Sequence, residues 1–166
     1  MGIFKRKKIT TAAVFTLTAM LTFTSIAFAE ETPTDKITVM LTGDLMCQRS
    51  QQLKAFDGTS YDFKPTFRYV KKIFDEADIV IGNLETLVSE SLPLSKDMNL
   101  LQGKPYLNAP NEWLDALEYA GFDGLIMANN HACDGGKTGI IETLEELDRR
   151  GIPHTGLYRS KQEKRY

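Results

Sequence analysis

The chain has 166 residues, with 20 Lys and Arg against 22 Asp and Glu and a formal net charge of −2 at pH 7. This balance excludes a general surface for binding nucleic acid or other polyanions, since such a surface needs an excess of positive charge. The two cysteines, Cys47 and Cys133, are too few for a disulfide-dense scaffold, so a packed apolar core has to hold the domain together. We expect two buried thiols, with a disulfide between them as the alternative.

The first 29 residues contain the three parts of a secretory signal peptide. Four basic residues lie within residues 1–8, residues 9–29 carry no charge, and Ala27-Phe28-Ala29 places small residues at the −3 and −1 positions of a cleavage site. We predict cleavage after Ala29, so that the rest of the chain is exported, either secreted or at the cell surface. The alternative is retention of residues 9–29 as a membrane anchor, because an apolar run of about 20 residues spans a bilayer.

Residues 30–35 are predicted to be a polar linker, and residues 36–166 to form one domain. Residues 37–42 predict a strand that is covered on both faces, because nearly every residue is β-branched or apolar. Residues 65–76 predict a helix, with Pro65 at its first position and apolar residues at three- and four-residue spacing. A second buried strand is predicted over 79–82.

Residues 86–107 contain Pro93, Gly103 and Pro105 and are expected to form an extended, irregular excursion. Residues 111–120 predict a helix that packs Trp113 into the core and ends at Gly121. A third strand over 124–128, a helix over 138–150 and a short strand near 152–155 complete the series. Because strands and helices alternate, we predict an α/β fold with a mostly parallel sheet, in which ligands bind at the carboxyl ends of the strands.

Polar side chains follow each of the three predicted strands. Each motif alone is more often a turn or a helix cap than a ligand, but the fold brings all three to one sheet edge. Carboxylate, amide and imidazole groups together suit a divalent ion, which activates water and stabilises phosphoryl displacement. The residues that this edge would gather are Asp44, Asn83, Glu85, Asn130, His131 and Asp134.

Taken in order, these motifs resemble the CapA family of capsule poly-γ-glutamate biosynthesis proteins, which is similar to the calcineurin-like metallophosphoesterases. The resemblance covers residues 36–166 and rests on GDLM at 43–46, ADIVIGNLE at 77–85, NAP at 108–110, GFD at 121–123, ANNH at 128–131 and GIPHTG at 151–156. It implies an α/β fold, a metallophosphoesterase-like layered sheet flanked by helices, with two metal ions at the strand ends. This chain would hold the N-terminal half of that fold, truncated at its C-terminus. Half of such a sandwich leaves one sheet face bare.

The resemblance also implies roles for individual residues. Asp44, Glu85 and Asn130 would be metal ligands, Asn83 would lie beside them in the second motif, and His131 would be catalytic, as general acid or transition-state stabiliser. The implied cofactor is a divalent metal ion, Mn²⁺, Mg²⁺, Fe²⁺ or Zn²⁺. One departure weakens a complete two-metal site, because Met46 stands where the superfamily has a His ligand two residues after its first Asp.

The function implied by the resemblance is extracytoplasmic and belongs to capsule poly-γ-glutamate synthesis or export. The expected partners are a membrane-associated polyglutamate synthase or export complex and an anionic polymer or phosphate ester, and not nucleic acid. The alternative is a metal-dependent phosphoesterase that acts on an extracytoplasmic phosphate ester. A catalytic site of that kind usually needs several His ligands, and this chain offers one good candidate, so the sequence leaves enzymatic activity open.

Overall fold

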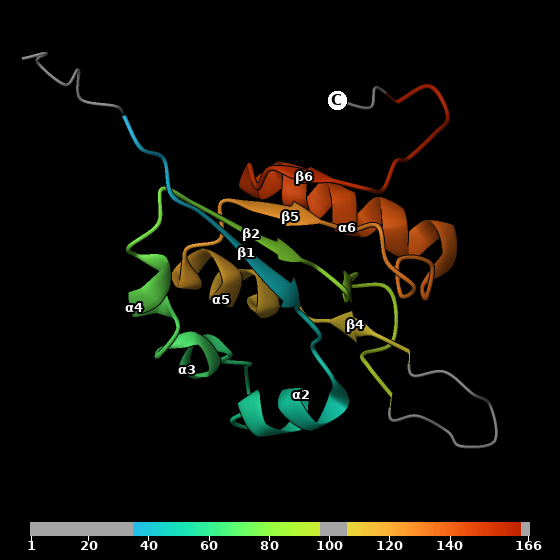
Figure 1. Ribbon diagram of the computed structural model, residues 1–166. Helices are drawn as coiled ribbons and strands as arrows, with labels where there is room; N and C mark the ends of the chain where they lie inside the picture. The colour runs from blue at the N-terminus through green and yellow to red at the C-terminus, as the bar shows by residue number, and fades with distance from the viewer. Residues whose placement is uncertain (1–34, 97–105, 164–166) are drawn as a thin grey trace, which may run out of the picture. The chain divides into compact units, whose positions relative to one another are not determined.

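A parallel four-stranded sheet organises the chain (Figure 1). The computed structural model describes residues 35–96 and 106–163, and the unit considered below is Ile37–Tyr166. All three strand pairings are parallel, as the alternation of strands and helices predicts. The segment predicted as signal peptide or anchor lies outside the described residues. The strands, in the order β1-β2-β5-β6, are β1 Val39–Asp44, β2 Ile79–Asn83, β5 Gly124–Ile126 and β6 His154–Thr155.

Five helices are described, two of them close to their predicted bounds. The helices α5 and α6 both end at a glycine in the left-handed conformation, Gly121 at φ 96° and Gly151 at φ 70°. The helix predicted over 65–76 is instead two short helices separated by a turn at residues 68–70. Aromatic and β-branched residues at this point, Tyr69 and Val70, are poor helix formers. The helices are α2 Arg49–Ala55, α3 Lys64–Phe67, α4 Lys71–Phe74, α5 Glu112–Ala120 and α6 Gly136–Arg150.

One short strand of a second, two-stranded parallel sheet lies in the stretch predicted to be irregular, and its partner follows directly after that stretch. This sheet pairs β3 Leu87–Val88 with β4 Asn108–Ala109. The fully buried side chain of Asn108 accepts a hydrogen bond from Ser89 N and donates to the carbonyl oxygens of Ser89, Leu92 and Pro93. The side-chain amide of Asn108 thus provides hydrogen-bond partners for the backbone groups of a loop whose prolines and short strands leave few hydrogen bonds of the sheet type. Apart from β3, the described residues of this stretch are irregular, as predicted, and a side chain rather than a periodic pattern orders them.

The core lies on one face of the large sheet. Val80 of β2 and Leu125 of β5 are almost fully buried and belong to the same apolar cluster as the buried side chains of α5 and α6. The opposite face is open: Leu41 is 74% exposed and Val39 50% exposed. The prediction that the first strand is covered on both faces was therefore wrong for this chain.

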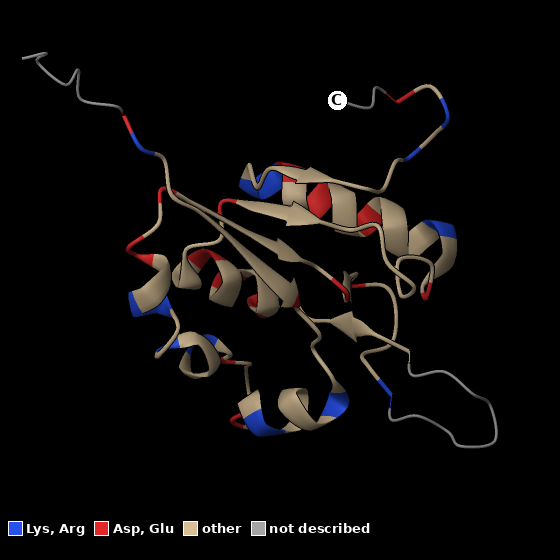
Figure 2. Ribbon diagram, in the orientation of Figure 1, with Lys and Arg blue, Asp and Glu red and all other residues tan. Residues whose placement is uncertain are grey.

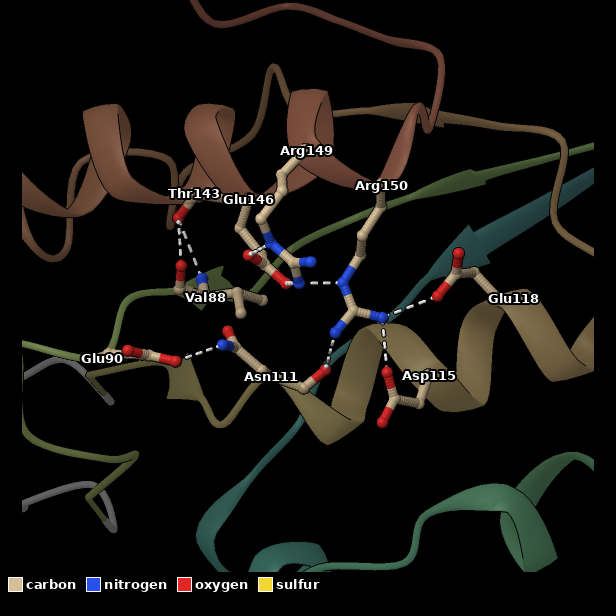
Figure 3. A network of polar contacts seen from close by, with 9 residues as sticks. All are labelled: Val88, Glu90, Asn111, Asp115, Glu118, Thr143, Glu146, Arg149 and Arg150. Atoms are coloured by element: carbon tan, nitrogen blue, oxygen red, sulfur yellow. Dashed lines mark hydrogen bonds and ion pairs between the residues drawn. The ribbon is translucent and has the colours of Figure 1, made fainter.

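A network of charged side chains joins α6 to α5 (Figure 3). The guanidinium of Arg150 donates to Glu146 Oε1 at 2.6 Å, to Glu118 Oε2 at 2.6 Å and to a carboxylate oxygen of Asp115. Hydrogen bonds from Arg149 and Arg150 lower the pKa of Glu146 to about 2. The network fixes the end of α6 against α5, beside the core that they share.

The two cysteines are free and differ in exposure. Cys47 is fully buried, and burial raises the pKa of its thiol to about 12. Cys133 is exposed in the loop before α6. The expectation of two buried thiols was right for Cys47 and wrong for Cys133, which lies in a polar turn that no apolar element covers.

Candidate functional site

The ends of β1 and β2 bring two carboxylates to one amide. Asp44 and Asn83 are the last residues of their strands and are paired in register, after an irregularity in β1 between Leu41 and Asp44. Asn83 Nδ2 donates to Asp44 Oδ1 at 2.7 Å and lies 3.4 Å from Glu85 Oε2. The parallel pairing thus places the first two predicted motifs side by side, as the sheet-edge argument expects.

Glu85 is the buried member of this pair of acids. Only 7% of the residue is exposed, whereas Asp44 is exposed to solvent. Burial raises the pKa of Glu85, the neighbouring Asp44 carboxylate raises it further, and the nearby imidazole of His131 opposes the shift. The neutral form of Glu85 is therefore favoured more than that of a free glutamate, and a nearby cation would reverse this preference.

His131 is held on the other side of Glu85. Its Nδ1 lies 2.7 Å from Asp134 Oδ2, and its Nε2 lies 3.9 Å from Glu85 Oε1. The same oxygen of Asp134 accepts a hydrogen bond from Leu107 N at 2.8 Å, so the carboxylate is itself fixed by the backbone before β4. The buried imidazole therefore has one nitrogen tied to Asp134 and the other directed at the carboxylates.

Asn129, and not Asn130, connects the third motif to the first two. Asn129 Nδ2 donates to Asn83 Oδ1 at 3.1 Å and to Leu84 O at 2.9 Å, and its Oδ1 accepts from His131 N at 3.1 Å. Asn130 is exposed, and no hydrogen bond within the described part of the chain joins it to the others. The sequence signal was the Asn-Asn pair, but the turn after β5 decides which of the two amides faces the sheet edge.

The structure therefore brings together five of the six residues named from the sequence, all except Asn130: Asp44, Asn83, Glu85, His131 and Asp134. It adds Asn129, which holds Asn83 in place. Carboxylate and amide oxygens are ligands that hard divalent cations prefer. Among residues 35–96 and 106–163, however, no group of three or more His, Cys, Asp or Glu side chains is arranged to hold a metal ion.

A cavity of about 280 Å³ reaches the cluster at Asp134 and is lined also by Leu92, Pro93, Lys96, Tyr106 and Gly135. Burial, and then the charge of Asp134, raise the pKa of Tyr106. Larger cavities of about 560 and 530 Å³ meet at Glu90 and Asn111, and none of the residues predicted for the site lines them.

No helix in the described ranges has the length and apolar character needed to cross a membrane.

Comparison with known proteins identifies the family of this arrangement. Residues 38–166 match the family described as bacterial capsule synthesis protein PGA_cap. The chain is 29% identical over 133 residues to capsule biosynthesis protein CapA of Bacillus anthracis, an alignment that covers 80% of this chain and 31% of that protein. It is 30% identical over 122 residues to PGA biosynthesis protein CapA of Bacillus subtilis (strain 168), covering 74% of this chain and 30% of that protein.

A relative outside Bacillus has a similar sequence identity to this chain. The chain is 28% identical over 127 residues to the uncharacterized protein y4sH of Sinorhizobium fredii (strain NBRC 101917 / NGR234), which covers 76% of this chain and 26% of that protein. The chain spans about a third or less of the length of these curated relatives. The family match nevertheless extends over most of the chain and over all the strands and helices described above. The chain belongs to the bacterial capsule synthesis protein family PGA_cap.

Proposed function

We propose that this protein acts outside the cytoplasm in the synthesis or export of capsule poly-γ-glutamate, and that the cluster at the carboxyl ends of β1, β2 and β5 binds a divalent cation. Family membership and the names of the two Bacillus relatives support the capsule role. The N-terminal pattern of basic residues, apolar run and Ala27-Phe28-Ala29 supports export. Protein sequencing of the exported form should give Glu30 as its first residue, and an intact Met1 in the membrane fraction would support the anchor instead.

The observation that carries the cation proposal is the sharing of one amide by Asp44 and Glu85. Asn83 Nδ2 lies 2.7 Å from the first carboxylate and 3.4 Å from the second, and the pKa of Glu85 is raised by its burial and by Asp44. Two carboxylates this close repel each other unless a proton or a cation lies between them. Their oxygen donors suit Mn²⁺ or Mg²⁺ better than a soft metal.

This chain alone is expected to bind such an ion weakly. The cluster offers two carboxylates and one imidazole, and the predicted ligand Asn130 lies apart from it. The remaining ligands would come from a longer protein of the family or from its partners, a membrane-associated polyglutamate synthase or export complex. An anionic polymer or a phosphate ester would bind through the ion rather than through the protein, because the chain carries more acidic than basic residues.

Calorimetric titration with Mn²⁺ tests the cation proposal. Asp44→Asn should abolish the weak binding, because it removes the charge of the exposed ligand while keeping its shape. Glu145→Gln, which removes a charge from the exposed face of α6, serves as the matched control and should leave binding unchanged. Equal loss of binding in both variants would show that the ion responds to overall charge and would overturn the proposal.

A second candidate function, a metal-dependent phosphoesterase, is favoured by the geometry of His131. Its Nδ1 lies 2.7 Å from the accepting Asp134 Oδ2, and its Nε2 faces Glu85 at 3.9 Å. An imidazolium, with a proton on each nitrogen, would donate from Nδ1 to Asp134 and offer its Nε2 proton to a ligand of the cluster. Hydrolysis of an aryl phosphate in the presence of Mn²⁺, lost in His131→Ala, would support this function. Cation binding without hydrolysis would favour the capsule role without catalysis.

A further inference from the structure

The exposed side of α3, α4 and the turn between them carries two rows of side chains. The other side packs into the core, where the ring centroids of Phe67 and Trp113 lie 5.5 Å apart. The turn keeps a helical backbone at Arg68 and Val70, with φ −54° and −74°, so side chains four residues apart stay on one side. The basic row is Lys64, Arg68 and Lys72, and the apolar row is Pro65, Tyr69 and Ile73.

The apolar row lies in water. Tyr69 is 71% exposed and Ile73 is 55% exposed, although the outer face of a helix on a soluble domain is normally polar. The Cζ of Arg68 lies 4.5 Å from the centroid of the Tyr69 ring, and its guanidinium donates to Tyr69 Oη at 2.6 Å. A tyrosine ring beside a cation, with an aliphatic side chain next to it, is typical of surfaces that enter the headgroup region of a bilayer.

The basic row is not neutralised by neighbouring acids. Residues 64–74 include four basic residues and no acidic residue. The nearest acid along the chain, Asp75, is paired with Lys71, whose Nζ lies 2.7 Å from Asp75 Oδ1. Within the ranges 35–96 and 106–163, no carboxylate forms an ion pair with a member of the basic row. Figure 2 shows Lys and Arg on each of α2, α3 and α4, so positive charge is concentrated at this end of a chain that is acidic overall.

We propose that the basic row and the apolar row together bind the anionic headgroups of a phospholipid bilayer. Lys and Arg side chains are attracted to an anionic lipid surface, and exposed Tyr and Ile side chains enter the boundary between headgroups and acyl chains. A soluble anionic polymer would engage the basic row alone and leave Tyr69 and Ile73 in water. The pairing of the two rows therefore favours a bilayer, and such binding does not require the cation site.

The chain enters the described domain close to this surface. Thr38 N donates to Asp78 Oδ2 at 2.7 Å, and Asp78 N donates to Thr38 O at 2.9 Å, just beyond the end of α4 at Phe74. The apolar run of residues 9–29 precedes this point in the sequence. A retained anchor would thus be joined to the domain at the end that carries the two rows.

Co-sedimentation with phospholipid vesicles tests the proposal. The form that begins at Glu30 is used, because residues 9–29 would enter a bilayer by themselves and the compact unit Ile37–Tyr166 lies wholly within this form. It should bind vesicles that contain phosphatidylglycerol more than about tenfold more strongly than vesicles of phosphatidylcholine alone. Binding should weaken as NaCl is raised from about 0.05 M to about 0.5 M, because salt screens the attraction.

Charge variants locate the binding surface. Arg68→Gln/Lys72→Gln should lower the partition coefficient on phosphatidylglycerol vesicles about 25-fold, since each basic side chain near an anionic surface contributes about fivefold. Lys137→Gln/Lys161→Gln removes two exposed charges elsewhere and is the matched control, which should change the coefficient less than about twofold because distant charges are screened. Equal losses in the two double variants would show a response to net charge alone and would overturn the proposal.

Apolar variants separate a bilayer from other partners. Tyr69→Ser/Ile73→Ser should lower the coefficient more than about tenfold, because it removes the side chains that enter the bilayer. Leu41→Ser, at a side chain that is 74% exposed on the open face of the sheet, is the control and should leave binding unchanged. Full binding by Tyr69→Ser/Ile73→Ser, with its fold confirmed by circular dichroism, would mean that charge alone is recognised, as by an anionic polymer, and would overturn the proposal. A stable dimer that this variant breaks would overturn it as well.

Discussion

The amide nitrogen of Asn83 lies 2.7 Å from Asp44 Oδ1 and joins the last residues of two neighbouring parallel strands. The carbonyl oxygen of the same amide accepts a hydrogen bond from Asn129 in the loop after β5. The side chain of Asn83 thus connects all three strand ends, because its amide nitrogen and its amide oxygen both make hydrogen bonds. Its loss should affect the stability of the protein as well as any ligand that binds there.

Asn83→Ala should lower the free energy of unfolding by about 1–3 kcal/mol, because it leaves Asp44, Glu85 and Asn129 without a shared partner. Urea denaturation of the variant measures the change. Asn130→Ala is the control: its side chain is exposed, so the free energy should stay within about 0.5 kcal/mol of the unmodified protein. A larger effect at Asn130 than at Asn83 would mean that Asn130, and not Asn129, faces the sheet edge.

Glu85→Gln should raise the melting temperature at pH 7 in the absence of metal. Burial and Asp44 raise the pKa of Glu85, so its contribution to stability is fully present below the ordinary glutamate pKa and is lost as the pH rises through the raised value. The amide of the variant does not ionise, so the variant keeps this contribution to stability at every pH. The difference in melting temperature should therefore disappear below about pH 4, near the pKa of an unperturbed glutamate.

Thermal unfolding followed by circular dichroism from about pH 3 to about pH 8 tests this dependence. Glu145→Gln is the matched control, since Glu145 lies on the exposed side of α6 and away from Asp44. A melting temperature that is lower in Glu85→Gln than in the unmodified protein at pH 7 would contradict the account, because it would mean that the ionised carboxylate is stabilised in the folded state.

Asn108→Ala should be among the most destabilising substitutions outside the apolar core. The buried amide makes four hydrogen bonds with the segment from Ser89 to Pro93, and its removal leaves those backbone groups unpaired in a dry environment. We expect a loss of about 2–4 kcal/mol in the free energy of unfolding. Chemical denaturation measures the loss, and a value under about 0.5 kcal/mol would show that water replaces the amide without cost.

Arg150→Met should lower the free energy of unfolding by about 1–3 kcal/mol, a value reduced from that of a buried ion pair because Asp115 and Glu118 are nearly half exposed. Arg149→Met, at a side chain that is mostly exposed, is the control and should lower the free energy of unfolding less than Arg150→Met does. Because the pKa of Glu146 is lowered to about 2, its stabilising contribution is present above the ordinary glutamate pKa and is lost as the pH falls toward 2.

The difference between the unmodified protein and Arg150→Met should consequently shrink as the pH falls from about 4 toward 2, where the Glu146 carboxylate that pairs with Arg150 becomes protonated. Denaturation curves at several pH values within this window measure the trend. A difference that stays constant across the window would show that Arg150 stabilises the structure through the packing of its aliphatic stem rather than through its charge.

The parallel sheet and the meeting of Asp44 with Asn83 could be predicted because strand–helix alternation determines where strand ends lie. The choice between Asn129 and Asn130 could not, since it depends on the path of the turn after β5. The helix α2 carries no apolar stripe and buries Gln52, so periodicity gives no signal for it.

The residues of β1 alone do not predict its open face, although the family resemblance implied that one face of the sheet is bare. A run such as Val39–Leu41 has the same composition whether one layer or two cover it, because the pattern reports the preference of the side chains and not the presence of a partner. The buried Asn108 is a further case, since its four hydrogen bonds replace a sheet ladder that the sequence does not encode as a period.

The measurement that tests the central proposal most directly is paramagnetic broadening of the amide signals of the ¹⁵N-labelled protein by Mn²⁺. The proposed site predicts that the signals of Asp44, Asn83 and Glu85 broaden first, and that Asp44→Asn removes this selectivity. The competing acidic region is the surface of α6 that carries Glu142, Glu145 and Glu146. Broadening that begins on α6 and leaves the strand ends unaffected would contradict the proposal.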